Sequence, residues 1–357
     1  MPQSDPIIFL DQPIGPGQPT FVIAEVGLNH NGDLSIAKQL IEEAADAGCN
    51  AVKFQKRDVN NLAVNSFLDL PDSRFPEFGQ TYREIRQFVE FDRAQYQEII
   101  GHANLHGIPF FCTPFDLPSA HFLQTLGVQA FKIASHCVTF SPLLDHVASL
   151  GHPTIMSTGM ASLDELDRAV NIFQTRQCPL ILLHCVSSYP TDRGLVNLRT
   201  INYLRSRYNL PVGYSGHEES SLEHAPTLGA VYAGACVVER HVTLDTKMMG
   251  FDHALSICPH DLRNLLDNIR LADQLLGIGE KIFYPEEQQK REQQVFSIVS
   301  ATKILKGNKI TKCMLTYKGP GTGLPAYRAD DLINKIAIVD IPPDTLIELK
   351  MVRQAND

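Results

Sequence analysis

The sequence predicts an α/β protein: a closed barrel of eight parallel strands and eight helices, followed by a small β-rich domain. Between about residues 20 and 280, short β-branched runs alternate with longer stretches of helical periodicity. The runs are apolar almost throughout, which is typical of strands that are buried on both faces. Eight such units in about 260 residues are what a closed parallel barrel requires.

Each of the eight expected strands precedes helix-like sequence. They span residues 21–26, 50–55, 108–113, 129–134, 153–158, 180–185, 210–215 and 235–240. After the first strand, the apolar residues from Leu34 to Ala45 fall on one helical face, and Gly48 stands where a helix-ending glycine is expected. An open doubly wound sheet is the alternative, but no G-x-G-x-x-G motif follows the first strand. The long insertion at 56–92 is expected on the face of the barrel that carries the βα loops.

The pattern changes after about residue 280. The segment YPEEQQKREQQ at 284–294 is polar and lacks a sustained apolar face, which indicates a linker or an exposed helix. Beyond it, SIVSATKILKGNKIT and KIAIVDIPPDTLIEL share one pattern of apolar run, turn and second apolar run. We therefore expect a barrel domain at 1–283, a linker at 284–295 and a small β-rich domain at 296–357.

Composition is that of a globular protein with a sizeable core, with 44% hydrophobic and 20% charged residues among 357. Lys and Arg number 31 against 40 Asp and Glu, and a net charge of −9 argues against nucleic-acid binding. No apolar segment approaches the roughly 18 residues of a membrane span, and the N-terminus lacks a signal-peptide pattern. The eight scattered cysteines form no CxxC pair, which predicts reduced core thiols in a cytoplasmic protein.

Polar residues gather at the carboxyl ends of the expected strands, where a parallel barrel places its catalytic groups. Every strand ends on or near such residues, and the strand starts carry no comparable set. In chain order they are Glu25, Lys53, Gln55, Thr113, Lys132, Ser135, Ser157, His184, Ser187, Tyr189, Ser215, His217, Glu239, Arg240 and His241. A single polar residue at a strand end has an ordinary explanation as a solvated side chain. Eight strand ends together predict a polar ligand, because buried charges are costly unless they are paired.

The stretch VVERHVTLD at 237–245 is either an edge strand that meets solvent or a strand that ends inside a site. His217 and His241 end neighbouring strands, and two imidazoles can share one divalent ion with positions left for water and substrate. This favours the second interpretation, with His241 facing the cavity.

A second group of strand-end residues suits an anion. Lys53 and Lys132 supply two ammonium groups, which can bind a phosphate or carboxylate dianion. Hydroxyl groups complete the cluster at Thr113, Ser135, Ser157 and Ser215.

Eight strand-end motifs stand out in the chain, and they are FVIAEVGLNHNGD, AVKFQ, FFCTPFD, FKIAS, IMSTGM, LLHCVSSYPT, GYSGHE and VERHVTLD. In the order and spacing of these motifs, and in its tail, the chain resembles the sialic acid synthases. These enzymes are phosphoenolpyruvate-dependent nonulosonate synthases with a (β/α)8 TIM barrel and a C-terminal antifreeze-like (SAF) domain. The resemblance implies condensation of phosphoenolpyruvate with an open-chain N-acetylmannosamine-like sugar, with C–O cleavage and phosphate release. It also implies a domain-swapped homodimer in which each antifreeze-like domain reaches over the partner's barrel.

The resemblance assigns roles to individual residues. The phosphoenolpyruvate would lie on Lys53, Thr113, Lys132, Ser135, Ser157, Ser187 and Ser215. A divalent ion, typically Mn²⁺, with Mg²⁺ or Co²⁺ as alternatives, would bind His217 and His241. The acceptor sugar would contact Glu25, Gln55, Tyr189 and Asp252. Among these, the catalytic roles fall on Glu25, Lys53, Lys132, His217 and His241.

The chain departs from the family pattern at four places. Cys137 stands where an acidic residue is usual, and Ser187 and Gly216 replace the Asn and Asp of bacterial enzymes, as in the animal branch. An arginine of the antifreeze-like domain is replaced at Gly319, and Arg328 could substitute for it. These changes leave open a different acceptor: another 2-acetamido sugar, a 2,4-diacetamido sugar or a neutral hexose.

Two functions of other classes remain as alternatives. A strand-end lysine could form a Schiff base in a metal-independent aldolase, although the paired histidines argue against it. A non-catalytic sugar-phosphate-binding or ice-binding protein is also conceivable, but a pure binder has no need of a divalent ion beside an anion cluster.

Overall fold

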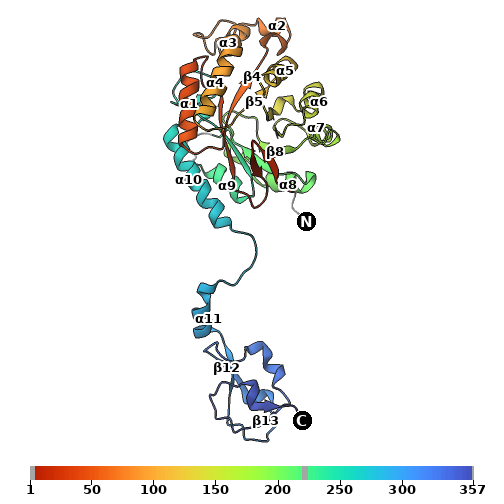
Figure 1. The fold of residues 1–357 in the computed structure, drawn as a ribbon, viewed down its shortest axis with the longest axis vertical. Helices are drawn as coiled ribbons and strands as arrows, with labels where there is room; N and C mark the ends of the chain where they lie inside the picture. Colours follow the sequence, from red (N-terminus) through yellow and green to blue (C-terminus); the bar gives the residue numbers. More distant parts are fainter. Residues whose placement is uncertain (1–4, 219–223, 356–357) are drawn as a thin grey trace. The chain divides into compact units, whose positions relative to one another are not determined.

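The structure is a computed structural model that describes residues 5–218 and 224–355. It divides into two compact units, residues 1–278 and 279–357. Each unit is described by itself (Figure 1).

The first unit is built around a closed parallel barrel with the strand order β10-β3-β4-β5-β6-β7-β8-β9. Its strands are β3 (Phe21–Gly27), β4 (Ala51–Lys56), β5 (Phe110–Pro114), β6 (Phe131–Ile133), β7 (Thr154–Ser157), β8 (Leu180–Cys185), β9 (Val212–Ser215) and β10 (Val237–His241). All eight predicted strands are present, and the predicted barrel is confirmed.

Four strands begin directly after a proline, at Pro109, Pro153, Pro179 and Pro211. Proline has no N–H to donate to the ladder, so the pairing starts one residue later. Its carbonyl still accepts, as Pro109 does from the Val52 N–H at 2.9 Å. This explains why β5, β7 and β9 start after the predicted positions, which included those prolines.

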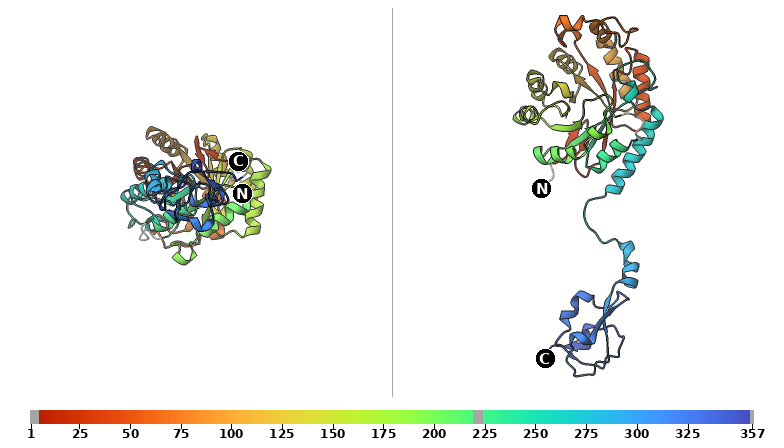
Figure 2. Two further views of the ribbon diagram at one scale, coloured as in Figure 1. Left: turned by 90° about the horizontal axis from the view of Figure 1, so that it is seen from below. Right: turned by 180° about the vertical axis from the view of Figure 1, so that it is seen from behind.

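Eight main helices surround the barrel. They are α1 (Leu34–Asp46), α4 (Arg93–Leu105), α5 (Leu117–Thr125), α6 (Ser141–Ser149), α7 (Leu163–Thr175), α8 (Arg199–Tyr208), α9 (Ala225–Tyr232) and α10 (Pro259–Leu276). Asp33 caps α1 by accepting from the backbone N–H groups of Ser35 and Ile36. The predicted Gly48 follows α1 with φ of +86°. Helix α10 lies beside α1 and completes the ring (Figure 2).

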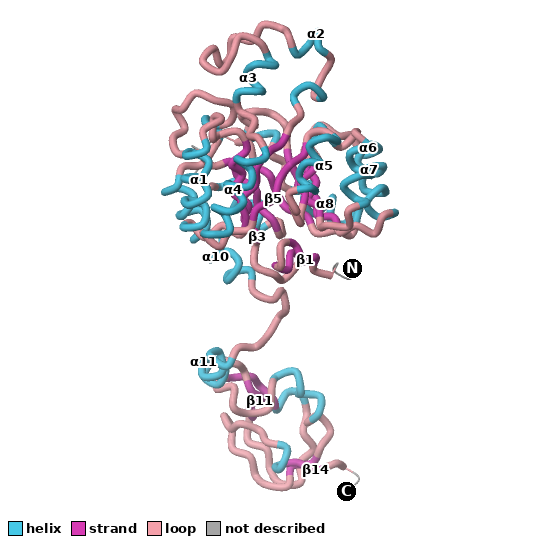
Figure 3. Tube along the Cα trace, turned by 45° about the horizontal axis from the view of Figure 1, so that its top comes forward, coloured by secondary structure: helices cyan, strands magenta, loops and turns pink. Residues whose placement is uncertain are grey.

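The insertion between β4 and β5 carries two short helices, α2 (Asn65–Leu68) and α3 (Tyr82–Phe88). Figure 3 shows them at the end of the barrel opposite the hairpin formed by β1 (Ile7–Phe9) and β2 (Gln12–Ile14). That end carries the carboxyl termini of the strands, so the insertion lies where it was predicted.

The β1–β2 hairpin was not predicted, and it closes the amino-terminal end of the barrel. Phe9 is fully buried, and its ring centroid lies 5.6 Å from that of Phe21 and 5.2 Å from that of Phe111. These rings belong to an apolar cluster inside the barrel, which also contains Ile155 and Ile181. The barrel interior next to the hairpin is therefore a packed apolar core, and the polar pocket lies toward the carboxyl ends of the strands.

The second unit contains two small antiparallel sheets with their own core. One pairs β11 (Ser297–Ser300) with β12 (Leu315–Lys318), and the other pairs β13 (Ile336–Ala337) with β14 (Val352–Arg353). The polar segment ahead of them forms α11 (Gln288–Gln294), which is exposed throughout. The fold class, a barrel followed by a small β-rich region, is confirmed.

Two further predictions concern the cysteines, expected as reduced core thiols, and the absence of a membrane span. All eight cysteines are free thiols, and six are buried, but Cys313 is exposed and Cys258 only partly buried, so those two are not core residues. In the part of the chain that the structure describes, none of the helices has the length and apolarity to cross a membrane.

Removing the buried aromatic ring of the β1–β2 hairpin should destabilise the barrel. Phe9→Ala removes a fully buried ring, and we expect a loss of about 3–5 kcal/mol in the free energy of unfolding. Denaturant unfolding measures this, with Ile8→Ala as the matched control, because Ile8 is 59% exposed in the same strand and should change stability by less than about 0.5 kcal/mol. Equal effects of the two substitutions would contradict the role of the hairpin as a barrel closure.

Candidate active site

One pocket opens at the carboxyl ends of the barrel strands, and it gathers nearly all the predicted site residues. Those that line it are Glu25, Lys53, Gln55, Thr113, Lys132, Ser135, Ser157, Tyr189, Ser215, His217, His241 and Asp252. Ser187 is the predicted residue outside this lining. His184, a strand-end residue, also lies elsewhere, because its Nε2 contacts the carbonyl of Val196 at 2.8 Å.

Buried lysines and carboxylates alternate across the pocket floor. Lys53 Nζ lies 2.7 Å from Glu25 Oε2 and 3.7 Å from Glu239 Oε2. Lys132 Nζ lies 3.6 Å from Glu239 Oε1, so Glu239 stands between the two lysines. All four side chains are at most 4% exposed. The two cations are thus retained in the barrel because two carboxylates offset their burial.

Hydroxyl groups extend this network. Lys53 Nζ donates to Thr113 Oγ1 at 3.0 Å, and Lys132 Nζ donates to Ser157 Oγ at 2.7 Å. Ser215 Oγ donates to Glu239 Oε1 at 3.0 Å. The predicted grouping of two lysines with strand-end hydroxyls is therefore present as direct contacts.

The two lysines differ in their protonation. Burial opposes the charge of Lys53, but Glu239 and Glu25 outweigh it and raise the pKa of the ammonium. Burial lowers the pKa of Lys132, which Glu239 only partly offsets while Lys53 lowers it further. Lys53 is therefore the firmly charged member of the pair, and Lys132 is the cation that would benefit most from a bound anion.

Gly159 brings two hydroxyls to one corner of the site. A Cβ at this position would lie 2.4 Å from Ser187 Oγ and 2.9 Å from Ser135 Oγ. The Gly159 N–H donates to Ser135 Oγ at 3.1 Å. Ser187 thus approaches the same corner as Ser135, although it does not line the pocket surface. Gly159, in the motif IMSTGM, was not among the predicted site residues.

His217 and His241 face each other, with ring centroids 5.5 Å apart. The Nδ1 of His217 lies 3.3 Å from the carbonyl of Val186, so a proton on Nδ1 leaves Nε2 free to bind a metal. Burial, and then the neighbouring His241, lower the pKa of His217 to about 3, which keeps the imidazole neutral. His241 Nδ1 is buried without a hydrogen-bond partner and lies 3.6 Å from Asp252 Oδ2. The neutral imidazole of His217, the orphaned ring nitrogen of His241 and a nearby carboxylate fit a divalent cation.

The alternation of side chains along β10 resolves the charged triplet of the sequence. Glu239 and His241 line the pocket, whereas Arg240 points to the opposite side and pairs with the buried Glu218. Tyr214 donates its hydroxyl to the same Glu218 carboxylate at 2.9 Å. A Cβ on Gly216 would lie 2.4 Å from Arg240 Nη1. The Asp-to-Gly departure at 216 therefore makes room for the pair formed by Arg240 and Glu218.

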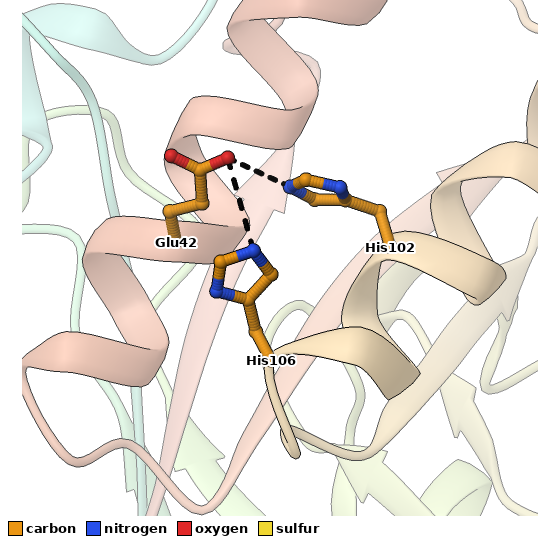
Figure 4. Close-up of side chains that lie close together, drawn as sticks. All are labelled: Glu42, His102 and His106. Carbon is orange, nitrogen blue, oxygen red and sulfur yellow. Dashed lines mark hydrogen bonds and ion pairs between the residues drawn. The ribbon is translucent and has the colours of Figure 1, made fainter.

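A second group that could hold a metal lies on the helical layer rather than in the pocket. Glu42 on α1 meets His102 and His106 at the end of α4, and their ligand atoms all lie within 4.8 Å of one another (Figure 4). Glu42 Oε1 is 2.9 Å from His102 Nε2 and 3.9 Å from His106 Nε2. None of the three lines the pocket, so this group has no access to a substrate bound there.

Several pocket residues escaped prediction. Glu239 appeared only as one of many strand-end residues, although the structure gives it the central position. Arg57, Arg86, His136, Met160 and Phe251 also line the pocket. Arg57 follows the second strand directly, which is a usable signal, but Arg86 lies within the long insertion, where nothing in the sequence pattern distinguishes it.

The surroundings of the other departures are as follows. Cys137 is 2% exposed, and its thiol lies 3.9 Å from the carbonyl of Phe115, so it packs in the core. Arg328 Nε donates to Asp331 at 2.6 Å within the second unit. Gly319 precedes a cis peptide bond to Pro320.

The chain is similar to known proteins over most of its length. The model of the NeuB family matches residues 40–281. An N,N'-diacetyllegionaminic acid synthase of Campylobacter jejuni is 38% identical, over 92% of this chain and 98% of that protein. The N-acetylneuraminate-9-phosphate synthase of Homo sapiens is 35% identical, over 95% of this chain and 94% of that protein. A crystal structure of an N-acetylneuraminic acid synthetase from Leptospira borgpetersenii, in complex with citrate, matches with a TM-score of 0.71 and 36% identity, over 80% of this chain and 95% of that one.

A methyl group on Gly216 should disrupt the ion pair behind the site. Gly216→Ala would force Arg240 away from Glu218, and we expect a loss of about 1–3 kcal/mol in unfolding free energy. The control is Gly101→Ala on α4, where a Cβ meets no atom within 4 Å and the helix should be unchanged or slightly stabilised. Denaturant unfolding compares the two, and an unchanged Gly216→Ala variant would mean that the pair is not constrained.

Proposed function

The chain belongs to the NeuB family, whose enzymes condense phosphoenolpyruvate with a sugar, and from this premise we propose the substrates and residue roles of a nonulosonic acid synthase. The proposed reaction joins phosphoenolpyruvate to an open-chain N-acetylmannosamine-like aldose. The observation that carries this proposal is the meeting of a lysine pair and a histidine pair in one pocket.

Phosphoenolpyruvate is assigned to the lysine side of the pocket. Lys53 and Lys132 supply positive charge, and the hydroxyl groups assigned to surround its oxygens belong to Thr113, Ser135, Ser157, Ser187 and Ser215. Anion binding here is electrostatically favourable because the site is buried and water competes weakly. The same groups stabilise the phosphate as it leaves.

A divalent ion is assigned to the histidine side. Members of the NeuB family use such an ion, and here His217 and His241 would hold it, with Asp252 nearby. Mn²⁺ is the proposed ion, with Mg²⁺ and Co²⁺ as alternatives. When bound, the ion supplies Lewis acidity that polarises the acceptor aldehyde.

The proposed bond changes balance without a covalent protein intermediate. C3 of phosphoenolpyruvate forms a bond to the aldehyde carbon, whose oxygen takes up a proton. Water adds at C2 and its oxygen becomes the keto oxygen as the C2–O bond to the phosphate breaks. Of the two protons that the water loses, one balances the proton taken up by the aldehyde oxygen and the other leaves with the phosphate. On the acceptor side, Glu25 accepts a hydrogen bond from Gln55 Nε2 at 2.6 Å, and this pair is assigned to orient the sugar with Tyr189 and Asp252.

The acceptor is the least constrained part of the proposal. The names of the two relatives point to different products, a diacetamido sugar acid in one and a phosphorylated sialic acid in the other. We propose an N-acetylmannosamine-like sugar, with a 2,4-diacetamido sugar or a neutral hexose as alternatives.

The second unit is proposed to be an antifreeze-like domain that covers the partner's barrel in a homodimer. The proposed bounds are 1–283 for the barrel domain and 296–357 for the antifreeze-like domain. Light scattering tests the dimer. The proposed location of the protein is the cytoplasm.

A Schiff-base aldolase is the second candidate, and the lowered pKa of Lys132 is the observation that favours it. Borohydride reduction in the presence of a keto-acid substrate distinguishes the two, because an adduct on Lys132 would indicate the aldolase.

The primary test incubates the protein with phosphoenolpyruvate, Mn²⁺ and candidate sugars, and measures release of phosphate. Phosphate release that requires both a sugar and a metal supports the synthase.

Removing the Lys132 charge should weaken phosphoenolpyruvate binding. We expect Lys132→Met to raise the Michaelis constant for phosphoenolpyruvate by an amount equivalent to about 2–5 kcal/mol, because one of the two cations that attract the anion is lost while Glu239 keeps its contact with Lys53. Steady-state kinetics measure the change. Lys38→Met is the control, since Lys38 pairs with Glu98 on the helical layer. An unchanged constant in Lys132→Met would refute the assignment.

The two candidate metal groups can be separated by single substitutions. His241→Ala should abolish tight Mn²⁺ binding and metal-dependent turnover, because it removes one of two imidazole ligands. His102→Ala removes a ligand of the helical group and should leave metal-dependent turnover intact. Mn²⁺ titration followed by electron paramagnetic resonance gives a readout besides activity. If His102→Ala rather than His241→Ala removed the metal dependence, the catalytic ion would have been assigned to the wrong place.

A further inference from the structure

We propose that the acceptor sugar carries a phosphate group, and that Arg57 and Arg86 bind this phosphate at the outer wall of the pocket. The inference rests on the proposed function and narrows its acceptor. It concerns the part of the pocket lined by Arg57, Arg86, Phe115, His136 and Phe251, which we call the outer wall.

Two different segments build the outer wall. Arg57 directly follows β4, and Arg86 comes from α3 in the insertion. The guanidinium carbon of Arg57 lies 3.7 Å from the centre of the Phe115 ring, and that of Arg86 lies 4.3 Å from the centre of the Phe251 ring. Stacking on an aromatic face fixes the plane of a guanidinium and leaves its N–H edge free to donate.

Both arginines have donors that the protein leaves unused. Arg57 Nη1 and Arg86 Nε are buried without a hydrogen-bond partner. The nearest carboxylate oxygen to Arg57 Nη1 belongs to Glu90, at 3.6 Å, which is too far for a hydrogen bond. Buried donors without partners are costly, and at a pocket wall they indicate that a ligand supplies the acceptors.

The charge at the outer wall is also out of balance. Glu90 faces Arg57 but lies closer to Lys56, whose Nζ is 3.0 Å from Oε2. Arg86 forms no ion pair with any residue in 5–218 or 224–355. By contrast, Lys53 and Lys132 on the pocket floor have Glu25 and Glu239 as partners. A phosphate monoester, which is dianionic near neutral pH, would supply the missing negative charge and accept hydrogen bonds from Arg57 Nη1 and Arg86 Nε, while Arg57 Nη2 keeps its contact with Gln55.

Repulsion between the two arginines supports the same conclusion. Burial and the charge of Arg57 lower the pKa of Arg86. His136, on the same wall, has its pKa lowered to about 4 by burial and by Arg57, so it is neutral and neither adds to nor offsets the positive charge of the arginines. The pair therefore stands in a positive potential that an anion relieves.

The outer wall extends from the histidine side of the pocket to the two arginines. His241 Nδ1 lies 3.6 Å from Asp252, and Phe251, the preceding residue, stacks with Arg86. A sugar with its aldehyde beside His217 and His241 can lie along this wall and present its far end to Arg86. The phosphate therefore belongs on the carbon remote from the aldehyde, as in N-acetylmannosamine 6-phosphate. Phosphoenolpyruvate keeps the separate lysine site.

The test compares N-acetylmannosamine with its 6-phosphate as acceptors, with phosphoenolpyruvate and Mn²⁺ present and the keto-acid product detected. The wild type should prefer the phosphorylated sugar by about 100-fold or more in kcat/KM, since several charge-assisted hydrogen bonds are gained. Arg86→Gln and Arg57→Gln should each reduce that preference by about 10- to 100-fold, through a higher KM for the phosphorylated acceptor.

Two further variants guard against a folding artefact. Arg83→Gln is the matched control on the same helix, because Arg83 contacts Asp69 and Asn65 outside the pocket and should leave the preference unchanged. Arg86→Lys keeps the charge and should retain more of the preference than Arg86→Gln, which a merely misfolded variant would not do.

The outcomes separate the inference from the function on which it rests. A wild type that uses the neutral sugar as well as the phosphorylated one overturns the inference and leaves the synthase proposal standing. A higher KM for phosphoenolpyruvate in Arg86→Gln, with the acceptor preference unchanged, also overturns it, since the arginine would then serve the other substrate. If neither form of the sugar yields product, the proposed acceptor class fails and the inference fails with it.

Discussion

A single buried carboxylate, that of Glu239, holds the pocket in a state that can receive an anion. It lies between Lys132 and Lys53, at 3.6 and 3.7 Å, where two ammonium groups alone would repel each other and lose their hydration. Glu25 adds a second contact to Lys53 at 2.7 Å. Because the charges are nearly balanced by the protein itself, the barrel can fold with both cations in place before any substrate arrives. The hydroxyl contacts to Thr113 and Ser157 depend on this arrangement.

The polar floor is possible because the rest of the barrel interior is apolar and closed. Phe9 of the hairpin packs on Phe21 and Phe111 beneath the site. Rigid strands then carry the polar side chains of the pocket above this core, and the surrounding loops complete its wall. The two arginines of the outer wall, Arg57 and Arg86, belong to the segment between β4 and β5. A pocket with two anion subsites, one on the strands and one on the loops, can bind two anionic substrates at separate places and so limit the repulsion between their charges.

Strand periodicity was enough to predict the barrel and the position of most site residues. Lys53, Lys132, His217 and His241 were found because each ends an apolar run, and parallel strands bring such ends together. Ser187 was placed in the same set, yet it reaches the corner at Gly159 rather than the pocket surface. The hairpin was missed because its strands are only three residues long, too short for a period to register.

By itself the sequence determined the order of the strands, their apolar faces and the chemistry at their ends, since these follow from local patterns of residue type. Only the tertiary structure decided which of those strand ends contact one another. Glu239 became the partner of two lysines and Arg240 the partner of Glu218 only through contacts between distant strands. Arg86 reached the pocket only because the insertion folds over it. Such contacts depend on how the barrel closes in three dimensions, and no spacing along the chain encodes them directly.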